Sequence, residues 1–354
     1  MTTSPDKLRF DPAALIEVSA PARLHLGFLD LGASLGRRFG SIGLAINSQQ
    51  TIIHITGANR LTISGVGNKA VLNKITELAE RFLGHYQAAL KDITKLPAMT
   101  IQELIPEHAG LGSGTQLALT IGRALTEFYK LSLNTAEIAS IMARGQRSGI
   151  GINTFDHGGF VVDGGLGKNS ILPPMLINMP FPADWRILLI FDRQYQGVHG
   201  DAESQAFMQL PEFPKADSQA ICQLTLMQLL PALAEQNIDA FGSAVTDIQA
   251  LIGKHFAPVQ GGQYTSPRVA KLLSQARQAG HQGIAQSSWG PTGCVFVDSA
   301  ATALQLQQQL QTYCAQHSMF NGIALQITDA ARHGARIKYL DAPSTISQLR
   351  SHHG

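Results

Sequence analysis

The N-terminal part of the chain alternates apolar and polar residues in a way that predicts a β-strand. Within residues 16–28, Leu24, Leu26 and Phe28 fall on one side of an extended backbone, and Arg23 and His25 fall on the other. Taken by itself, this pattern is typical of a half-exposed edge strand with a solvated arginine.

A second alternating run, residues 99–105, precedes apolar residues at helical spacing, namely Leu117, Ile121, Leu125 and Phe128. The intervening residues 106–115, PEHAGLGSGT, therefore connect a strand to a helix. Glycines let the backbone approach a ligand closely, and a helix N-terminus offers unpaired N–H groups and a partial positive charge. The stretch predicts a phosphate site, and the alternative is a glycine-rich turn with Ser113 as a plain N-cap. It is neither a Walker loop nor a G-x-G-x-x-G fingerprint.

The remaining pattern predicts an α+β protein. The first half has further strands at 51–56 and 60–64, joined by a short turn, a helix at 71–83, and another helix beginning at Asn134 with the capping-box residue Glu137. The second half alternates strands and helices, with strands at 186–191, 281–287, 294–298, 322–327 and 336–340 and helices at 219–233, 238–252, 267–279 and 301–316. This order favours an antiparallel sheet with helices packed on one face.

The proline distribution suggests where the chain divides. Four prolines cluster within residues 173–182, between the two patterns. We therefore expect a first domain at 16–175, a second at 183–342, and flexible tails at 1–15 and 343–354.

Composition narrows the possible partners. The 354 residues are 44% hydrophobic and 15% charged, with a net charge of +2 and no dense Lys/Arg cluster. A globular enzyme is expected, with no nucleic-acid or membrane partner, and formation of a homodimer stays open. Because no signal peptide or long apolar run is seen, a cytoplasmic location is predicted. Cys222, Cys294 and Cys314 are too dispersed for a metal cluster or a disulfide framework.

Residues 147–165 form the second informative stretch, RSGIGINTFDHGGFVVDGG. They contain four groups able to do chemistry, Arg147, Asp156, His157 and Asp163, between glycines. Their density near the phosphate loop favours a site, although Asp163 before two glycines suits an ordinary turn equally well. Asp156 and His157 do not form a triad pair, since neighbours on a strand point apart. A later glycine-containing loop, 192–203, adds the carboxylate of Glu203.

The glycine loop resembles the phosphate loop of the GHMP superfamily of small-molecule kinases, Pro-x-x-x-Gly-Leu-Gly-Ser-Ser-Ala. Pro106, Gly110, Leu111, Gly112 and Ser113 match it, whereas Gly114 and Thr115 replace Ser-Ala. The resemblance implies the GHMP kinase-like two-domain α+β fold, with an N-terminal ribosomal protein S5 domain 2-like unit and a C-terminal ferredoxin-like α/β sandwich.

The kinase motif Pro-Ser-Gly-x-Asp-Asn is not preserved. Aligned on Ser148 and Gly149, its aspartate falls on Gly151 and its asparagine on Ile152. Glycine cannot accept a proton from a substrate hydroxyl, so the usual phosphoryl-transfer machinery is missing.

One branch of the superfamily differs from the kinase motifs in the same way. Residues 23–25, 41–45, 110–116, 148–165 and 286–292 together resemble the β-ribofuranosylaminobenzene 5'-phosphate synthases. The resemblance implies condensation of 4-aminobenzoate, or 4-hydroxybenzoate, with phosphoribosyl pyrophosphate, releasing CO2 and pyrophosphate, in tetrahydromethanopterin biosynthesis. No organic cofactor is implied, and Mg²⁺ is expected.

The resemblance also suggests roles for the candidate residues. Phosphate or pyrophosphate is assigned to Gly110, Leu111, Gly112, Ser113, Gly114 and Thr115. Catalytic candidates are Asp156, His157, Asp163 and Glu203, of which Asp156 or Glu203 could bind Mg²⁺. Substrate contacts are assigned to Arg23, His25, Arg147, Ser148, Ser287, Ser288, Trp289 and Thr292, the last four closing the site from the second domain.

Two alternatives stay open on the sequence alone. The first is an ATP-dependent kinase in which another residue replaces the missing aspartate. The second is a non-catalytic ligand sensor on the same fold.

Overall fold

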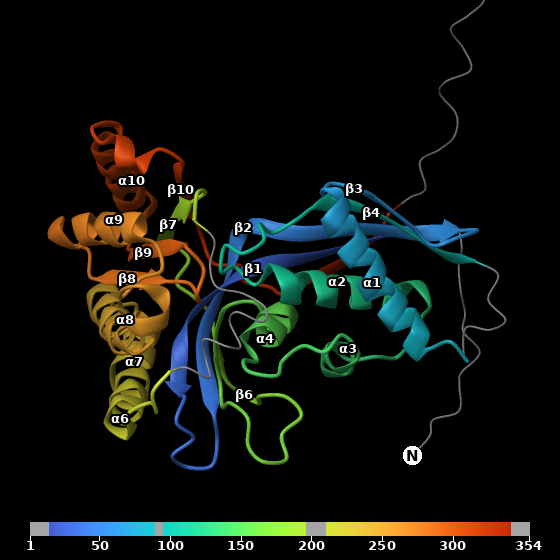
Figure 1. Ribbon diagram of the computed structural model, residues 1–354, viewed down its shortest axis with the longest axis horizontal. Coiled ribbons are helices and arrows are strands. Elements are labelled where there is room, and N and C mark those ends of the chain that lie inside the picture. The colour runs from blue at the N-terminus through green and yellow to red at the C-terminus, as the bar shows by residue number, and fades with distance from the viewer. Residues whose placement is uncertain (1–13, 89–94, 196–209, 341–354) are drawn as a thin grey trace, which may run out of the picture.

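The computed structural model describes residues 14–88, 95–195 and 210–340, which form two β-sheets with helices around them (Figure 1). The first sheet has the strand order β11-β1-β2-β4-β3, and β5 joins it by pairing with β2 and β6. Its strands are β1 (Leu15–Asp30), β2 (Phe39–Ala58), β3 (Thr62–Gly65), β4 (Leu96–Glu103), β5 (Phe160–Asp163), β6 (Met175–Met179) and β11 (Arg336–Leu340).

Helices cover one face of this sheet. They are α1 (Lys69–His85), α2 (Ser113–Phe128), α3 (Thr135–Ile141) and α4 (Ile150–His157). Alternate residues of β1, such as Ile16 and Val18, are fully buried against apolar residues of α1 and α2, including Phe82 and Ile121. The predicted capping box of α3 is present, since Asn134 and Glu137 bond reciprocally.

The second sheet is antiparallel, in the order β10-β7-β9-β8. Its strands are β7 (Arg186–Asp192), β8 (Gly283–Gln286), β9 (Gly293–Val297) and β10 (Ile323–Thr328). The associated helices are α6 (Lys215–Leu224), a π-helical turn (Thr225–Leu229), α7 (Leu230–Ala234), α8 (Ile238–Gln260), α9 (Pro267–Gln278), α10 (Ala300–Ala315) and a short 3₁₀ turn (Ser318–Phe320).

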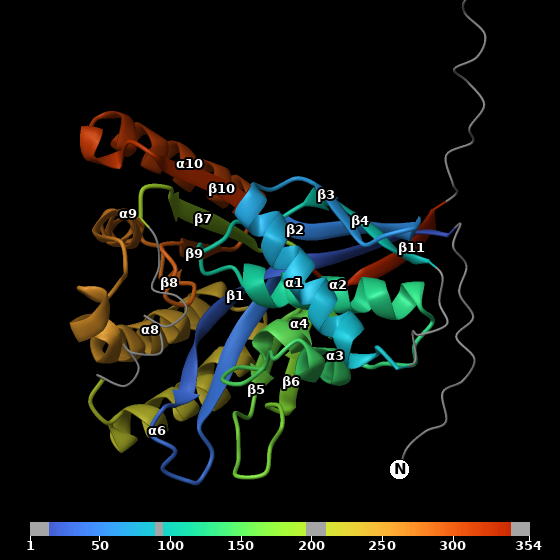
Figure 2. The same ribbon diagram turned by 45° about the vertical axis from the view of Figure 1, so that its right-hand side comes forward.

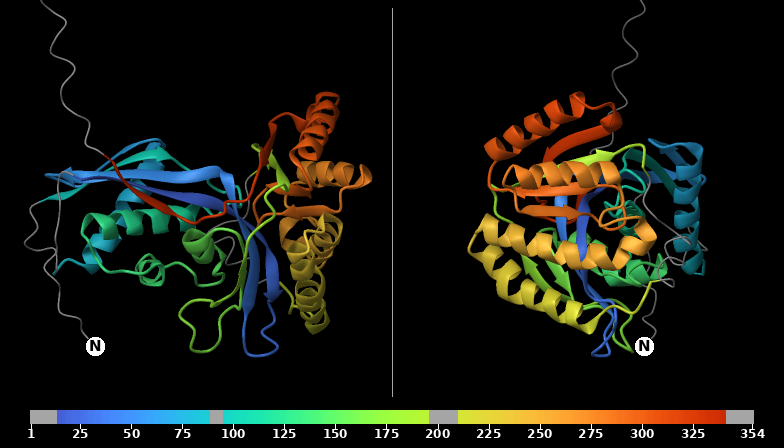
Figure 3. Two further views of the ribbon diagram at one scale, coloured as in Figure 1. Left: turned by 180° about the vertical axis from the view of Figure 1, so that it is seen from behind. Right: turned by 60° about the vertical axis from the view of Figure 1, so that its left-hand side comes forward.

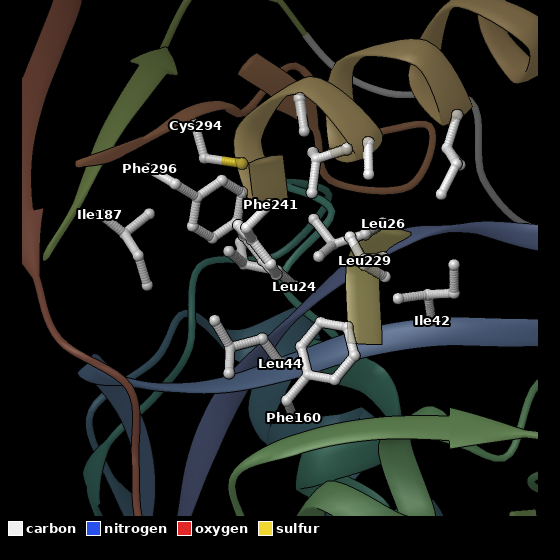
Figure 4. Packing of buried hydrophobic residues seen from close by; sticks show 14 of the residues in the cluster. Leu24, Leu26, Ile42, Leu44, Phe160, Ile187, Leu229, Phe241, Cys294 and Phe296 are labelled. Atoms are coloured by element: carbon white, nitrogen blue, oxygen red, sulfur yellow. The ribbon is translucent and has the colours of Figure 1, made fainter. Parts of the chain in front are cut away.

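Both faces of the second sheet are covered, whereas the sequence pattern predicted helices on one face. Leu188 and Ile190 pack against α9 and α10, and the alternate residues Ile187 and Leu189 face the opposite way. On that side α8 and the first sheet share one core, where Phe241 of α8 meets Phe160 of β5 at 6.1 Å between ring centroids (Figure 4).

The last described strand belongs to the first sheet. Residues 336–340 were expected in the second domain, but β11 pairs antiparallel with the start of β1, from Leu15 opposite Leu340 to Ser19 opposite Arg336. Figure 2 and the left view of Figure 3 show this strand running back beside the blue strands. The start of β1 therefore lies between β2 and β11 and is not an edge, because strand pairing depends on partners that are distant in sequence.

Two further features depend on strand pairing that the local sequence does not reveal. The strand at 60–64 follows β2 after a short turn but pairs in parallel with β4. The proline-rich boundary contains β6, which pairs with β5, so the first unit extends beyond residue 175. The predicted tails fall almost entirely outside the described residues.

Candidate active site

The predicted phosphate loop connects β4 to α2. Gly112, in the left-handed region at φ 81° and ψ 16°, is the N-cap residue of α2, and it makes no side-chain cap. Ser113 is thus the first helical residue, so the plain N-cap alternative is wrong. Gly110 also has a positive φ of 79°, and a Cβ there would lie 2.2 Å from the carbonyl oxygen of Ser287. Both backbone angle and space therefore require glycine at position 110.

Strand β1 and the turn between β8 and β9 hold the loop's carbonyl groups. The guanidinium of Arg23 and the hydroxyl of Ser287 each donate a 2.7 Å hydrogen bond to the Gly110 carbonyl. The Arg23 N–H donates to the Leu111 carbonyl at 3.1 Å. In a trans peptide the C=O and the following N–H point in opposite directions. Binding these two carbonyls therefore turns the N–H groups of Leu111 and Gly112 away from β1.

The loop consequently has the form of an anion-binding nest. Positive φ at Gly110 and Gly112 on either side of Leu111 lets successive N–H groups converge. Within the described part of the chain, the N–H groups of Leu111, Gly112, Ser113 and Gly114 have no hydrogen-bond partner. These donors lie at the positive end of α2, a suitable arrangement for phosphate or pyrophosphate.

The turn at residues 287–292 lies directly against this loop, as its predicted role requires. The Ser287 hydroxyl accepts the His25 N–H at 3.0 Å, and the Ser288 N–H donates to the His25 carbonyl at 2.9 Å. A Cβ at Gly290 would lie 2.3 Å from the Gly110 nitrogen, so the two backbones are in contact. Trp289 packs edge-on against Phe256, at 4.8 Å between centroids. Sequence segments far apart thus form one rigid clamp, residues 23–25, 110–112 and 287–292.

His25 is buried at the back of this clamp. Burial, and secondarily the charge of Arg23, lowers the pKa of His25 to about 3. Its ring is therefore neutral near pH 7 and supplies no positive charge to a substrate carboxylate or phosphate. Its Nε2 has no hydrogen-bond partner in the described structure and adjoins a cavity of about 40 Å³ that also borders Gln249 and Gln286.

The N-terminal turn of α4 meets that of α2. The Gln116 side-chain amide donates to the Gly151 carbonyl at 2.9 Å. A Cβ at Gly151 would lie 2.7 Å from Cγ2 of Thr115. Position 151 is where the kinase motif has its aspartate, and position 115 is where the kinase loop has alanine. The threonine methyl thus occupies the space into which an aspartate side chain would extend.

Asp163 organises the start of α4 from a fully buried position at the end of β5. Its carboxylate accepts the N–H groups of Gly149 and Gly165, both at 2.9 Å. The Ser148 hydroxyl lies 3.5 Å from the carboxylate and accepts the Ile150 N–H at 3.2 Å. Burial raises the pKa of Asp163 to about 6, against the opposing effect of these hydrogen bonds. Asp163 and Ser148 are therefore positioned to fix the backbone beside the loop.

The structure does not bring Asp156 and His157 to the phosphate loop. Within residues 147–165, the short helix α4 spans Ile150–His157, and these two side chains are exposed at its C-terminal end. Asp156 accepts a short hydrogen bond from the Thr135 hydroxyl at the start of α3. Six residues of helix place Asp156 about 9 Å along the axis from Ile150. The argument that 156 and 157 point apart on a strand was also wrong, because they lie on a helix. Glu203 lies outside the described residues.

A large cavity adds two residues that the sequence analysis missed. It measures about 710 Å³ and is bordered by Arg38, Arg147, His255, Phe39 and Phe213. Arg38 lies over the Phe39 ring at 5.2 Å and donates to the Leu31 carbonyl at 3.1 Å. Burial lowers the pKa of His255, against the opposing charge of Asp217. No motif marked Arg38 or His255, because their proximity depends on the packing of α8 against the β1–β2 hairpin.

This cavity and the loop lie along the same strand. Arg23 contacts the loop, and Phe28, five residues further along β1, pairs with Ser41, which itself pairs with Asp163. Five strand residues span about 16 Å. Leu31, which borders the arginine cavity, lies three residues beyond Phe28, so the nest and this cavity are separate regions along β1.

The residues that the structure describes contain no group of three His, Cys, Asp or Glu side chains arranged to hold a metal ion. The three cysteines are free, and burial raises the pKa of each thiol. In the same part of the chain, no helix combines the length and apolarity needed to cross a bilayer.

Family models match both halves of the chain. The model described as GHMP kinases N terminal domain matches residues 73–164, and the model described as GHMP kinases C terminal matches residues 229–316. Among solved structures, galactokinase of Lactococcus lactis has a TM-score of 0.66 at 13% identity, covering 92% of this chain and 96% of that one. Homoserine kinase of Cytophaga hutchinsonii has a TM-score of 0.64 at 16% identity, covering 96% and 99%. These similarities establish the fold.

Curated relatives are closer in sequence. Beta-ribofuranosylphenol 5'-phosphate synthase of Archaeoglobus fulgidus is 33% identical, covering 85% of this chain and 93% of the relative. The enzymes of the same name from Methanocaldococcus jannaschii and Methanothermobacter thermautotrophicus are 33% and 30% identical, covering 79% and 77% of this chain and 89% and 86% of theirs. The chain therefore belongs to the β-ribofuranosylphenol 5'-phosphate synthase family, a branch of the GHMP superfamily.

Proposed function

We propose that this chain is a pentosyltransferase that joins a 4-substituted benzoate to phosphoribosyl pyrophosphate with loss of CO2 and pyrophosphate. The relatives are named for a phenol product, which favours 4-hydroxybenzoate, and 4-aminobenzoate would give the aminobenzene product instead. The observation that carries the proposal is the anion nest at 110–114 in a site whose kinase aspartate is replaced by glycine. The product would enter tetrahydromethanopterin biosynthesis.

In this reaction, negative charge develops on the departing pyrophosphate, and the site has hydrogen-bond donors there. The bond between ribose C1 and the pyrophosphate oxygen breaks, and the electron pair leaves with pyrophosphate, onto which the N–H groups of 111–114 converge. The ring carbon that bears the carboxylate bonds to ribose C1. CO2 then departs, and its bonding electrons restore the aromatic ring. Arg38 and Arg147 would hold the ribose 5-phosphate at the other end of the substrate.

The packing of Thr115 argues against the kinase alternative. An aspartate at position 151 would need the space that the Thr115 methyl fills. Without a carboxylate there, the first turn of α4 has no side chain that can deprotonate an acceptor hydroxyl as kinases do. The phosphate loop lies beside Gly151, the position at which kinases have their catalytic aspartate. This arrangement suits departure of pyrophosphate better than transfer of a phosphoryl group.

Mg²⁺ would accompany pyrophosphate, since protein-bound Mg²⁺ commonly keeps several waters and contacts substrate phosphates. The described carboxylates near the loop do not form a ligand cluster, and Asp163 already accepts backbone N–H groups. We therefore assign Mg²⁺ to the substrate and derive no step from it. The proposed reaction involves no organic cofactor, nucleic acid or membrane. The cytoplasmic location and the homodimer stay predictions.

The test is release of labelled CO2 from carboxyl-labelled 4-hydroxybenzoate or 4-aminobenzoate with phosphoribosyl pyrophosphate and Mg²⁺. We expect CO2 and pyrophosphate in equal amounts, dependent on the phosphoribosyl donor. A parallel reaction with ATP in place of the donor should release none. Absence of release from both acids, together with no calorimetric binding of phosphoribosyl pyrophosphate, would overturn the proposal.

A further inference from the structure

A second large cavity, of about 480 Å³, adjoins the N-terminal side of the phosphate loop. The loop residues His108 and Ala109 border it, together with Thr292 from the clamp and Gln49 from β2. Gln49 lies in the bulge of β2 that faces Pro21 and Ala22, whereas the arginine cavity begins beyond Phe28. The two cavities therefore lie on opposite sides of the loop along β1.

One wall of this cavity contains a buried hydroxyl group that lacks a hydrogen-bond partner in the described structure. The Thr292 side chain is fully buried, and its hydroxyl has no hydrogen-bond partner in the described structure. A buried hydroxyl without a partner destabilises the fold unless a ligand or a water bonds to it. Thr292 follows Pro291 in the turn that contacts Gly110, so this residue borders the cavity on the side of the loop.

Another wall contains a pair of amides. Gln49 donates its amide N–H to the side-chain oxygen of Gln326 at 2.9 Å. The oxygen of Gln49 and the amide nitrogen of Gln326 take no part in that bond, and both residues border the cavity. One acceptor and one donor are thus available side by side. Such a pair can bond to a hydroxyl or to an aromatic amine, because each of these groups can donate and accept.

The two walls are spaced for a flat ring. Thr292 directly precedes β9, Gln326 lies on β10, and β7 runs between these strands. Two strand spacings and an offset of two residues along the strands separate their backbones by about 12 Å. The half-buried ring of Phe191 on β7 borders the cavity between them and offers an apolar surface. A planar aromatic acid with polar groups at both ends of the ring matches this arrangement.

We propose that this cavity is the subsite for the aromatic acid, with its carboxylate end at Thr292 and its para substituent at the Gln49–Gln326 pair. The assignment rests on the proposed function, because the carboxylate-bearing carbon must face the loop where pyrophosphate leaves. It gives a physical reason why one site could accept either a para hydroxyl or a para amino group. It also leaves the arginine cavity to the ribose 5-phosphate.

The test uses Thr292→Val and Gln326→Leu, which remove the hydroxyl and one amide while keeping similar volume. We expect each to weaken equilibrium binding of 4-hydroxybenzoate about ten-fold and to raise its KM similarly, as loss of one buried hydrogen bond predicts. The KM for phosphoribosyl pyrophosphate should stay within about two-fold of the wild-type value. Thr292→Ser keeps the hydroxyl and should restore acid binding, and Gln308→Leu on exposed α10 is the matched control.

The outcomes separate the two proposals. If the wild type turns over and both variants bind the acid normally, the subsite is wrong and the function stands. If the wild type binds the acid, the variants lose it and none releases CO2, the subsite stands and the reaction is wrong. If the wild type neither binds the acid nor releases CO2, both are overturned. Unfolding midpoints of the variants, compared with Gln308→Leu, show whether weakened binding reflects the site or the fold.

Discussion

At the scale of single residues, the pair Thr115 and Gly151 explains how a kinase scaffold can have lost its acceptor-activating group. The methyl of Thr115 fills the space beside Gly151, so the two positions are mutually dependent. A carboxylate could return to position 151 only if position 115 became smaller. A contact between the helices α2 and α4 thus limits which side chain position 151 can have.

We predict that Gly151→Ala lowers the free energy of unfolding by about 1–3 kcal/mol, because its Cβ would overlap Thr115 Cγ2. The double variant with Thr115→Ala should recover most of that loss. Urea denaturation of all four proteins measures the coupling. Gly114→Ala is a suitable control, since a Cβ there meets nothing within 4 Å. Additive effects of the two substitutions would show that the contact does not constrain position 151.

Asp163 has a stability consequence that depends on pH. The pKa of Asp163 is about 6 in the folded chain and near its ordinary value of 3.8 when the chain is unfolded. Between these values the folded state binds more protons than the unfolded state, so the contribution of Asp163 to stability falls as pH rises. His25, whose pKa is lowered to about 3, has the opposite sign and loses stability as pH falls below its ordinary value.

We predict that the stability difference between wild type and Asp163→Asn shrinks by up to about 3 kcal/mol between pH 4 and pH 6, and is constant above that. His25 is present in both proteins, so its contribution cancels. Urea unfolding at several pH values provides the measurement. A difference that is independent of pH would mean that Asp163 titrates normally.

At the scale of elements, the clamp formed by β1, the phosphate loop and the β8–β9 turn sets the direction of the N–H groups of residues 111–114, to which we assign the anion. Ser287 is its central side chain, because its hydroxyl joins the His25 N–H to the Gly110 carbonyl. We therefore expect Ser287 to act as a positioning residue through its contact with the loop.

We predict that Ser287→Ala costs about 1–3 kcal/mol of folding free energy, since it leaves the buried His25 N–H without a partner. The KM for phosphoribosyl pyrophosphate should rise more than the KM for the aromatic acid, because the nest would be less well oriented. Steady-state kinetics with each substrate varied in turn, compared with the exposed Ser318→Ala, tests this. Equal changes in both KM values would indicate general loosening of the fold.

Local patterns predicted these elements better than they predicted their partners. The strand over 16–28, the loop at 106–115 and the capping box at Asn134 all follow from nearby residues, and each is present. The clamp was partly foreseen, because its residues match family motifs. Arg38 and His255 were missed, since only packing between α8 and a distant hairpin brings them to one cavity. Asp156 was misplaced because glycines at both ends of 147–165 concealed a short helix.

At the scale of the whole molecule, the two sheets share one core, and the final strand returns to the first sheet. The side chains of β11 are mostly exposed, so its main contribution is to pair the backbone of β1.

We predict that a chain ending at Ala335 is less stable and associates more readily than one ending at Leu340, because the start of β1 becomes an unpaired edge. Thermal unfolding and light scattering of the two truncated proteins provide the comparison. Identical melting temperatures and scattering would show that β11 does not protect β1.

The pairing of β11 with β1 also determines when the first sheet can be completed during protein synthesis. The phosphate loop and the strand that holds it are translated early. Leu340, the partner of Leu15, is translated only after all strands of the second sheet. The first sheet thus stays incomplete while the second unit emerges from the ribosome, and its closure joins segments of very large sequence separation, a slow step in folding. A nascent chain released before residue 336 would display an open strand edge to chaperones.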